Sequence, residues 1–292
     1  MSFISIIKGK ILSIVTSVSL MLKAFKKIYR HGGYTIVNIS SIQYGQVLKG
    51  RKIVVTGGGA GIGFNIAKRC LEEGASVVIT GRSENKLREA CKQLNSGLLQ
   101  PLVWDISEVS EIHKGLEKAT FLLGGDIDIL INNAGVLDTT PFPYITEQIW
   151  DKIYATNSKG LFFLTQTLCE KWMICRNNSL KKIINISSQG GFVGATYPYR
   201  MTKWDVAGLT QGLGIKLAQH GIIVNGIAPG IIATDMQPGF LHQKENVFIT
   251  ENPLQRIGLP EEIAELAIFL MSDSANFIVG QTIVCDGGYS IK

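Results

Sequence analysis

The sequence predicts a layered α/β protein with one main domain, residues 51–292, preceded by an N-terminal helical extension, residues 1–50. Its 292 residues, 46% hydrophobic and 18% charged, suffice to bury one sizeable core. It has 32 glycines, 8 prolines and no internal repeat or low-complexity tract, which argues against the fibrous and disordered classes. Short apolar runs of strand length recur between helical segments, as in proteins with a buried parallel sheet.

The net charge of +6 is located in the extension. Residues 1–50 contain seven Lys or Arg and no Asp or Glu, which leaves the other 242 residues with a charge of −1. The main domain therefore has no excess of basic residues, and we expect no nucleic-acid partner.

The five cysteines are scattered, with no CxxC pair and no His at metal-ligand spacing. We therefore expect reduced thiols that pack as small apolar residues in a cytoplasmic protein, and no metal site.

The extension contains apolar residues three and four apart from Ile4 to Ile28, which predicts an amphipathic helix with a basic end. Its uncharged part, Ile11 to Leu22, has 12 residues, well short of the roughly 20 that cross a bilayer. No small-x-small cleavage site follows, which disfavours a signal peptide. Two interpretations stay open: peripheral membrane contact through residues 1–30, or packing on the domain or on a second subunit. Residues 31–50 are expected to form a connector with one short strand at 34–39.

The main domain begins with a strand at 53–55, a glycine-rich turn, TGGGAGIG, at 56–63, a helix at 64–73 and a strand at 76–80. In such a unit a pyrophosphate binds at the helix N-terminus, and glycine lets the backbone approach it. A turn that only packs helix on strand is the alternative. We expect a dinucleotide to bind at Thr56, Gly57, Gly59, Gly61, Ile62 and Gly63.

The end of the second strand indicates which dinucleotide binds. It continues into Gly81, Arg82 and Ser83 and has no acidic residue there. A carboxylate at this point would bind the ribose 2′-hydroxyl, whereas an arginine attracts a 2′-phosphate. We therefore predict NADP(H) as the preferred cofactor, with NAD(H) second, and Arg82 and Ser83 at the 2′-phosphate; a solvated arginine at a helix start is the alternative.

Two further strands end in polar residues. The strand at 99–104 is followed by Asp105 and Ile106, and the strand at 127–131 is followed by NNAG. Ligands of open α/β sheets bind at the carboxyl ends of strands, so we expect Asp105 and Ile106 to contact the adenine. Capping of a helix at 108–116 is the alternative for Asp105.

These motifs and several later ones resemble the short-chain dehydrogenase/reductase family in its compact form, over about residues 50–292. The resemblance implies a doubly wound, mostly parallel seven-stranded Rossmann sheet and a homodimer or homotetramer. It rests on TGGGAGIG, Asp105, NNAG at 132–135, Asn157 in TNSKG, NISS at 185–188, YRMTK at 199–203, APG at 228–230 with Thr234, and DGG at 286–288.

The resemblance also implies further cofactor contacts. The NNAG segment would close around the cofactor, and the segment after APG would hold the nicotinamide. The residues concerned are Asn133, Ala134, Gly135, Pro229, Gly230, Ile232 and Thr234.

Tyr199 and Lys203 lie four residues apart, so in a helix they project from the same face. A nearby ammonium lowers the pKa of a phenol, which suits it to acid/base work. The resemblance implies that Tyr199 is the general acid/base, that Lys203 lowers its pKa and holds the nicotinamide ribose, that Ser188 binds the substrate oxygen, and that Asn157 holds a water in the proton relay. Both Tyr199 and Lys203 would also contact the cofactor.

The approach to Tyr199 departs from the family pattern in two ways. Ser188 precedes Tyr199 by 11 residues, so the intervening loop is shorter than the resemblance implies and Ser187 is a rival for the serine role. Pro198 directly precedes Tyr199 and is expected to start the helix there.

The function implied is NADP(H)-dependent interconversion of a carbonyl and a secondary alcohol on a small molecule. A 3-oxoacyl-thioester reductase acting with acyl carrier protein is the alternative. A non-catalytic nucleotide-sensing or membrane scaffold protein ranks lower, because both Tyr199 and Lys203 are present.

Overall fold

The computed structural model describes residues 45–175, 179–234 and 248–291, together with eight residues between 18 and 29. Those eight are helical and exposed, whereas the rest of the predicted N-terminal helix and the predicted strand at 34–39 lie outside the described residues.

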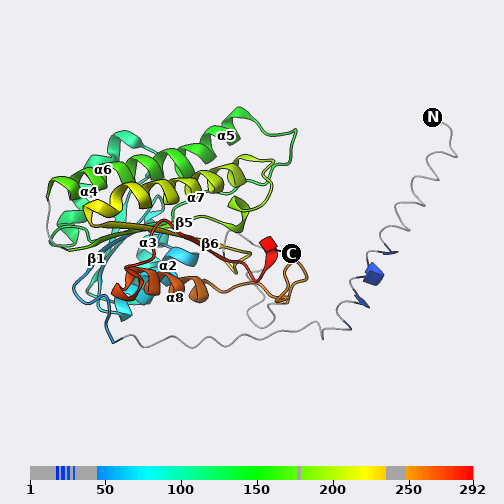
Figure 1. Ribbon diagram of the computed structural model, residues 1–292, viewed down its shortest axis with the longest axis horizontal. Coiled ribbons are helices and arrows are strands. Elements are labelled where there is room, and N and C mark those ends of the chain that lie inside the picture. The colour runs from blue at the N-terminus through cyan, green and yellow to red at the C-terminus, as the bar shows by residue number, and fades with distance from the viewer. Residues whose placement is uncertain are drawn as a thin grey trace.

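Seven strands form one sheet in which every neighbouring pair is parallel (Figure 1). The strand order is β3-β2-β1-β4-β5-β6-β7, so the predicted doubly wound seven-stranded sheet is confirmed. The strands are β1 Lys52–Thr56, β2 Ser76–Gly81, β3 Leu99–Val103, β4 Ile129–Asn132, β5 Lys181–Ile186, β6 Ile222–Pro229 and β7 Thr282–Cys285.

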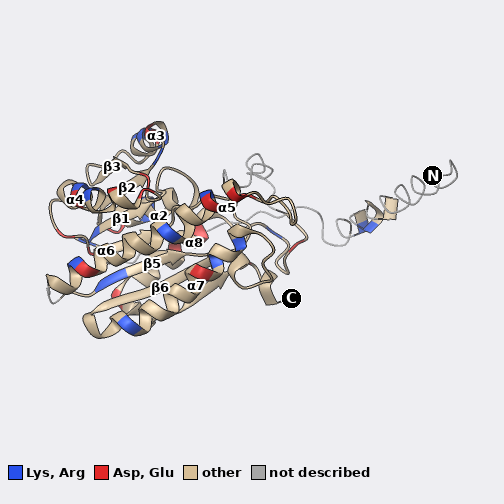
Figure 2. Ribbon diagram, turned by 90° about the horizontal axis from the view of Figure 1, so that it is seen from above, with Lys and Arg blue, Asp and Glu red and all other residues tan. Residues whose placement is uncertain are grey.

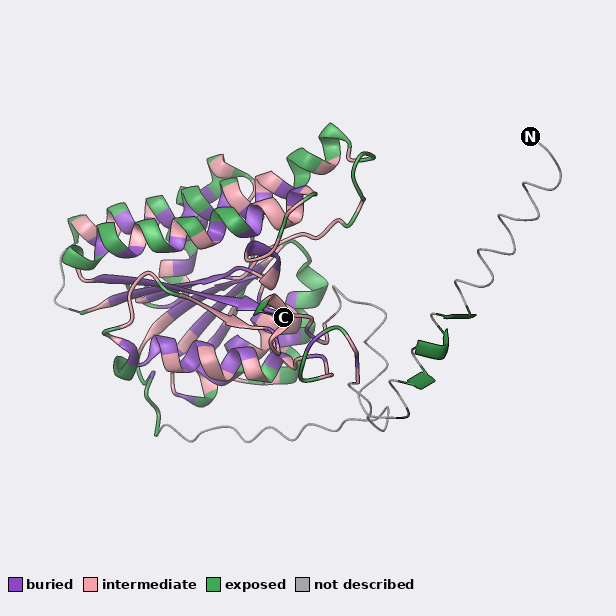
Figure 3. Cartoon of the chain, turned by 45° about the vertical axis from the view of Figure 1, so that its right-hand side comes forward, coloured by how far each residue is buried: buried purple, intermediate pink, exposed green. Residues whose placement is uncertain are grey.

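Helices cover both faces of the sheet, with α2, α3 and α8 packed on one face and α4, α6 and α7 on the other (Figure 1). The central strands are buried, β7 is half-buried and β3 includes exposed residues, and the exposed residues of the helices lie on their outer sides (Figure 3). The helices are α2 Gly61–Glu72, α3 Glu84–Leu94, α4 Ile112–Leu122, α5 Glu147–Tyr154, α6 Leu161–Ile174, α7 Pro198–Leu217 and α8 Pro260–Met271.

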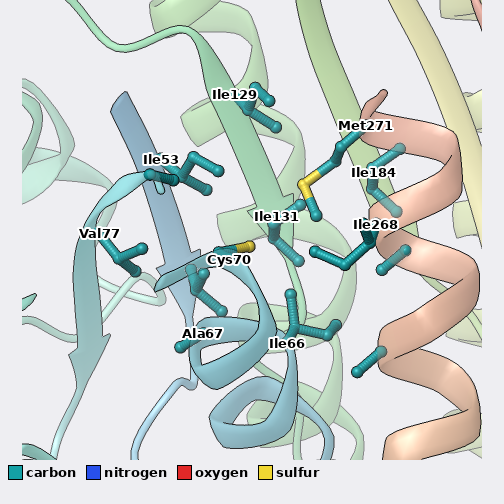
Figure 4. Close-up of a cluster of buried hydrophobic side chains, with 14 of the residues drawn as sticks. Ile53, Ile66, Ala67, Cys70, Val77, Ile129, Ile131, Ile184, Ile268 and Met271 are labelled. Atoms are coloured by element: carbon teal, nitrogen blue, oxygen red, sulfur yellow. The ribbon is translucent and has the colours of Figure 1, made fainter. Parts of the chain in front are cut away.

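The core on the first face is built from strand and helix residues that are far apart in the sequence. Ile66 and Cys70 of α2 meet Ile268 and Met271 of α8 beneath the central strands (Figure 4). All four side chains have at most 1% of their surface exposed. These strands are apolar on both sides because each side faces a helix layer, which explains their unbroken apolar runs.

The packed unit begins slightly before the predicted boundary at residue 51. Leu48 is fully buried, and its backbone N–H donates to the Glu73 carbonyl at 3.1 Å. The chain is therefore already attached to the end of α2 before β1 starts.

Lys, Arg, Asp and Glu are interspersed over the helices of the main domain (Figure 2). Within the described residues, no helix is both long enough and apolar enough to cross a membrane. The same part of the chain shows no cluster of three or more His, Cys, Asp or Glu that could hold a metal ion.

Two helical glycines make a matched test of the packing on the second face. A Cβ on Gly115 of α4 would lie 2.2 Å from the Trp104 ring, whereas a Cβ on Gly208 of α7 would meet no atom within 4 Å. We expect Gly115→Ala to lower the free energy of unfolding by about 1–3 kcal/mol through overpacking. Gly208→Ala should raise it by about 0.5–1 kcal/mol, because alanine favours the helix. Urea unfolding measures both, and equal effects would contradict the packing of Trp104 on α4.

Candidate active site

The carboxyl ends of β1 and β4 are joined by a group of short hydrogen bonds. The Thr56 hydroxyl donates to the Ile131 carbonyl at 3.1 Å and accepts from the backbone N–H groups of Asn133 and Ala134 at 3.0 Å. The Asn133 amide donates to the carbonyls of Thr56 at 2.9 Å and Gly57 at 3.0 Å. Thr56 and Asn133 therefore support the shape of the glycine turn.

Two glycines allow this turn to exist. Gly57 has a φ of +67°, and a Cβ there would lie 2.9 Å from the Ala134 Cα. A Cβ on Gly63 would lie 2.4 Å from both the Asn133 amide nitrogen and the Gly57 carbonyl oxygen. Any side chain at either position would separate the turn from the NNAG segment.

A cavity of about 320 Å³ lies at the ends of β2 and β3. Of the predicted cofactor residues it is lined by Gly57, Gly59, Arg82, Ser83, Asp105, Ile106, Ala134 and Gly135.

Three polar residues of this cavity have defined contacts. Arg82 Nε lies 4.0 Å from Asp105 Oδ2. Asp105 Oδ1 accepts from the backbone and hydroxyl of Ser107 at 3.0 and 2.7 Å, so it closes a local turn and does not cap the helix that follows. Ser83 Oγ accepts from the Lys86 backbone N–H at 3.4 Å and caps α3.

Lys86 lines the same cavity and was not singled out from the sequence. The available signal was its place three residues after the capping Ser83, which puts it on the first turn of α3.

The residues of this cavity fit the adenosine half of a dinucleotide. The Thr80 hydroxyl and the Trp104 indole N–H lie on its wall, buried and without hydrogen-bond partners among the described residues. Buried polar atoms without a partner indicate a missing hydrogen-bonding group. Arg82, Ser83 and Lys86 are the residues that would hold phosphate or ribose oxygens.

A second cavity, of about 460 Å³, continues from the first and shares Gly57, Ala60, Lys86, Ala134 and Gly135 with it. The predicted residues on its wall are Gly57, Gly61, Ile62, Asn133, Ala134, Gly135, Ser188, Tyr199, Lys203, Pro229, Gly230, Ile232 and Thr234. Thr56, Gly63 and Asn157 lie outside both linings and support them from behind.

Tyr199 and Lys203 stand on the first turns of α7, which starts at Pro198 as predicted. The Lys203 Nζ lies 5.6 Å from the centre of the Tyr199 ring and donates to the Ile186 carbonyl at 2.9 Å. Proline at the first helical position suits the helix, because its fixed φ is helical and it has no N–H to leave unpaired. Both the tyrosine and the lysine line the second cavity.

The two candidate serines differ in their surroundings. The Ser188 hydroxyl hydrogen-bonds the Tyr199 phenol and accepts from the Gly190 N–H at 3.1 Å. Ser187 is buried, and its hydroxyl donates to the Lys203 backbone carbonyl at 2.7 Å. In spite of the short loop, Ser188 is thus the serine beside Tyr199, and Ser187 supports α7.

Burial controls the protonation of the pair. Burial raises the pKa of Tyr199, the hydrogen bond with Ser188 opposes that rise, and the neighbouring Tyr197 adds to it. Burial likewise lowers the pKa of Lys203 to about 8. The expected lowering of the tyrosine pKa is therefore not met in this structure, because loss of solvent disfavours both charged forms.

Asn157 lies in a π-helical turn, Ala155–Gly160, between α5 and α6. Its side-chain oxygen accepts from the Val136 N–H at 2.8 Å, and its amide donates to the Val136 carbonyl at 2.9 Å and to Thr202 Oγ1 at 3.2 Å. Both N–H groups of the amide are used in these bonds, whereas the side-chain oxygen keeps a second lone pair that can accept from a water. The side chain also fixes the chain after NNAG against α7.

A buried polar chain behind the site was also not recognised from the sequence. The Asn132 amide donates to Thr165 Oγ1 at 2.9 Å and to Asn185 Oδ1 at 2.8 Å. The Asn185 amide donates in turn to Thr210 Oγ1 at 2.9 Å. These bonds join β4 and β5 to α6 and α7. The available signal was an asparagine at the end of each of two apolar strands.

A cavity of this length, with glycines at one end and a buried lysine beside a half-buried tyrosine and serine at the other, defines a class of enzyme. It suits an oxidoreductase that moves hydride between a dinucleotide and a carbonyl carbon.

Comparison with known proteins agrees with that class. The family model described as "Enoyl-(Acyl carrier protein) reductase" matches residues 57–290. The chain is 35% identical over 246 residues to a 3-oxoacyl-(acyl carrier protein) reductase of Staphylococcus aureus, covering 82% of this chain and 97% of that protein. It is 33% identical over 251 residues to a gluconate 5-dehydrogenase of Gluconobacter oxydans, covering 84% of this chain and 96% of that protein.

Solved structures give the same result. A 3-ketoacyl-(acyl carrier protein) reductase from Brucella melitensis, complexed with NADH, superposes with a TM-score of 0.74 at 28% identity and covers 84% of this chain and 100% of that one. A putative gluconate dehydrogenase from Agrobacterium tumefaciens has a TM-score of 0.77 at 27% identity, with 86% and 100% coverage. The chain belongs to the short-chain dehydrogenase/reductase family and is an NAD(P)-dependent oxidoreductase acting on CH–OH groups of small molecules.

Proposed function

We propose that this enzyme interconverts a ketone and a secondary alcohol with NADP(H), using Tyr199 as general acid/base. The observation that carries the proposal is the grouping of Tyr199, Ser188 and Lys203 on the wall of the second cavity, next to the glycine turn. The cofactor supplies or accepts the hydride at this end of the cavity.

The protein's own groups handle the proton. In reduction, the Tyr199 hydroxyl gives its proton to the substrate oxygen, and burial keeps the phenol protonated until then. The Ser188 hydroxyl donates to the same oxygen and stabilises the charge that develops there. Lys203 and Asn157 border Gly135, with Lys203 Nζ 3.8 Å and Asn157 Oδ1 3.4 Å from a Cβ placed on that glycine. Lys203, whose Nζ lies 5.6 Å from the centre of the Tyr199 ring, would restore the tyrosine proton, and Asn157 would hold the segment in position.

Replacing Tyr199 and Tyr197 one at a time shows which of the two tyrosines is the proton donor. We expect Tyr199→Phe to lower kcat for carbonyl reduction by about 10²–10⁴-fold, because the proton donor is lost. Tyr197→Phe, its matched control, should stay within a few-fold of the native rate. The rate of NADPH oxidation with an accepted ketone gives kcat for both variants. Near-native turnover by the Tyr199→Phe protein would contradict the mechanism.

The two serines give a second test. Ser188→Ala should lower kcat by about 10²-fold through loss of a hydroxyl at the reacting oxygen. Ser187→Ala should chiefly lower stability, by about 1 kcal/mol, because it breaks the bond to the Lys203 carbonyl. The reverse pattern would assign the catalytic role to Ser187.

The preference for NADP(H) is supported by the charge around the first cavity. Arg82, Lys86 and the capped N-terminus of α3 present positive charge to a 2′-phosphate, and Arg82 is 58% exposed at its side chain.

We expect Arg82→Ala to lower kcat/KM for NADPH by about 10–100-fold and to leave kcat/KM for NADH unchanged. Arg88→Ala is the control, since Arg88 pairs with Glu84 on the exposed side of α3. If the Arg82→Ala protein kept the native preference for NADPH over NADH, the assignment of Arg82 to the 2′-phosphate would be wrong.

A 3-oxoacyl-thioester reductase is the second candidate function. It is favoured by the activities of the similar proteins from Staphylococcus aureus and Brucella melitensis. Both candidates use the same residues and differ in the substrate that enters the second cavity.

We expect a homodimer or homotetramer, assembled through helices. Phe162 and Phe163 of α6 and Trp204 and Ile215 of α7 are 36–76% exposed on the layer that covers the second face. Apolar groups gathered on adjacent helices favour association. Sedimentation equilibrium of the full chain tests this, and a monomer would exclude it.

The extension that precedes Leu48, where packing against the domain begins, is proposed as a unit separate from the domain and as a peripheral membrane contact of a cytoplasmic protein. In its described part Val18, Met21, Leu22, Phe25 and Tyr29 are exposed at helical spacing, and the segment is basic. When anionic liposomes are sedimented, the full chain should be found in the pellet with them, and a protein lacking residues 1–30 should stay in the supernatant. Equal distribution of the two proteins would contradict membrane contact.

A further inference from the structure

The substrate side of the second cavity contains an arginine directly after the catalytic tyrosine. Arg200 lies on the first turn of α7 and lines this cavity together with Tyr197 and Tyr199. Its Cζ is 5.3 Å from the centre of the Tyr197 ring, and its Nη1 donates to the Gly194 carbonyl at 3.0 Å. The guanidinium is thus oriented by an aromatic face and a backbone oxygen.

Gly190 lies close to both Arg200 and Ser188. A Cβ on Gly190 would lie 3.0 Å from Arg200 Cγ and 3.5 Å from Ser188 Oγ. The stem of the arginine and the hydroxyl that meets the substrate oxygen therefore lie on either side of one small residue. Arg200 and Ser188 also line the same cavity, so one ligand there can contact both.

Arg200 differs from the other arginines in its electrostatic partners. In the described part of the chain, the other five arginines each have a carboxylate within 4.0 Å, and Arg200 has none. Glu251 is the acidic residue on the described wall of this cavity and does not pair with Arg200. A half-buried guanidinium with free N–H groups is a binding site for a carboxylate.

A second polar group in this cavity lacks a hydrogen-bond partner. Gln189, which follows Ser188, lines the cavity, and its Oε1 is buried with no donor among the described residues. A Cβ on Gly230 would lie 3.1 Å from this oxygen, so it faces the segment proposed to border the nicotinamide. An acceptor in that position calls for a ligand that carries a hydroxyl.

Resting on the proposed function, we infer that the substrate is a short polyhydroxy acid, taken up as its oxo form in reduction. Arg200 binds the carboxylate, Ser188 and Tyr199 hold the reacting oxygen, and Gln189 accepts a bond from a neighbouring hydroxyl. A 3-oxoacyl thioester has no carboxylate near its carbonyl, so it would leave the guanidinium unpaired.

The test compares three probes with NADPH: 5-oxogluconate, which has the carboxylate and hydroxyls; fructose, which has hydroxyls but no charge; and 4-oxopentanoate, which has the charge but no hydroxyls. Acetoacetyl-N-acetylcysteamine represents the thioester. We expect kcat/KM to be highest for 5-oxogluconate. Arg200→Gln should lower kcat/KM about 10–100-fold for both acids and leave fructose within twofold, with partial recovery in Arg200→Lys.

Gln189→Leu is the second variant. It should lower kcat/KM for 5-oxogluconate about 10-fold and leave 4-oxopentanoate unchanged. An equal loss on all probes would place Gln189 against the cofactor and overturn its role with the hydroxyl. Arg88→Gln is the control for loss of a positive charge, and circular dichroism of each variant reports folding.

The outcomes separate this inference from the function on which it rests. A native enzyme that prefers the thioester, or an Arg200→Gln protein that treats charged and uncharged probes alike, overturns the polyhydroxy acid while carbonyl reduction stands. Absence of turnover on every probe, with NADPH bound, would overturn both.

Discussion

The meeting of β1 and β4 is the constraint on which the rest of this structure depends. The strand order places these two strands side by side at the point where the chain switches direction across the sheet, and there a dinucleotide binds in α/β proteins. Thr56 and Asn133 join the two strand ends by short hydrogen bonds. Since both residues are engaged with backbone groups, the glycine turn has one shape before any ligand arrives.

The catalytic end is held by buried polar bonds as well as by apolar packing. Asn132 and Asn185 link adjacent strands to each other and to α6 and α7. Asn157 and Ser187 fix α7 from two further directions. A buried hydrogen bond is costly to break because its partners cannot turn to water. The tyrosine and the lysine are therefore positioned by side chains packed around α7. Burial raises the pKa of the phenol and lowers the pKa of the lysine.

Prediction from the sequence was most successful where chemistry depends on local spacing. The strand, glycine turn and helix at the start of the domain, and the start of α7 at Pro198, were predictable because positive φ, close approach and helical period are local properties. Predictions that concern side-chain environment were less successful. The phenol pKa was expected to fall and instead rises, because burial depends on segments that close over Tyr199 from elsewhere. The alternative of a helix cap for Asp105 is wrong, because its carboxylate closes a turn with Ser107. Asp105 does line the first cavity, and its contact with the adenine stays a prediction.

The sequence by itself determined the fold class, the family and the Tyr199–Lys203 pair, and it predicted where a dinucleotide binds, because each follows from residue type at fixed spacing. Only the tertiary structure decided that Ser188, and not Ser187, meets the tyrosine, that Lys86 joins Arg82 in one cavity, and that Arg200 and Gln189 line the second cavity together with Tyr199. Those relations depend on how a short loop and a helix pack against strands distant in the chain. The spacing of residues along the sequence does not predict how these segments pack.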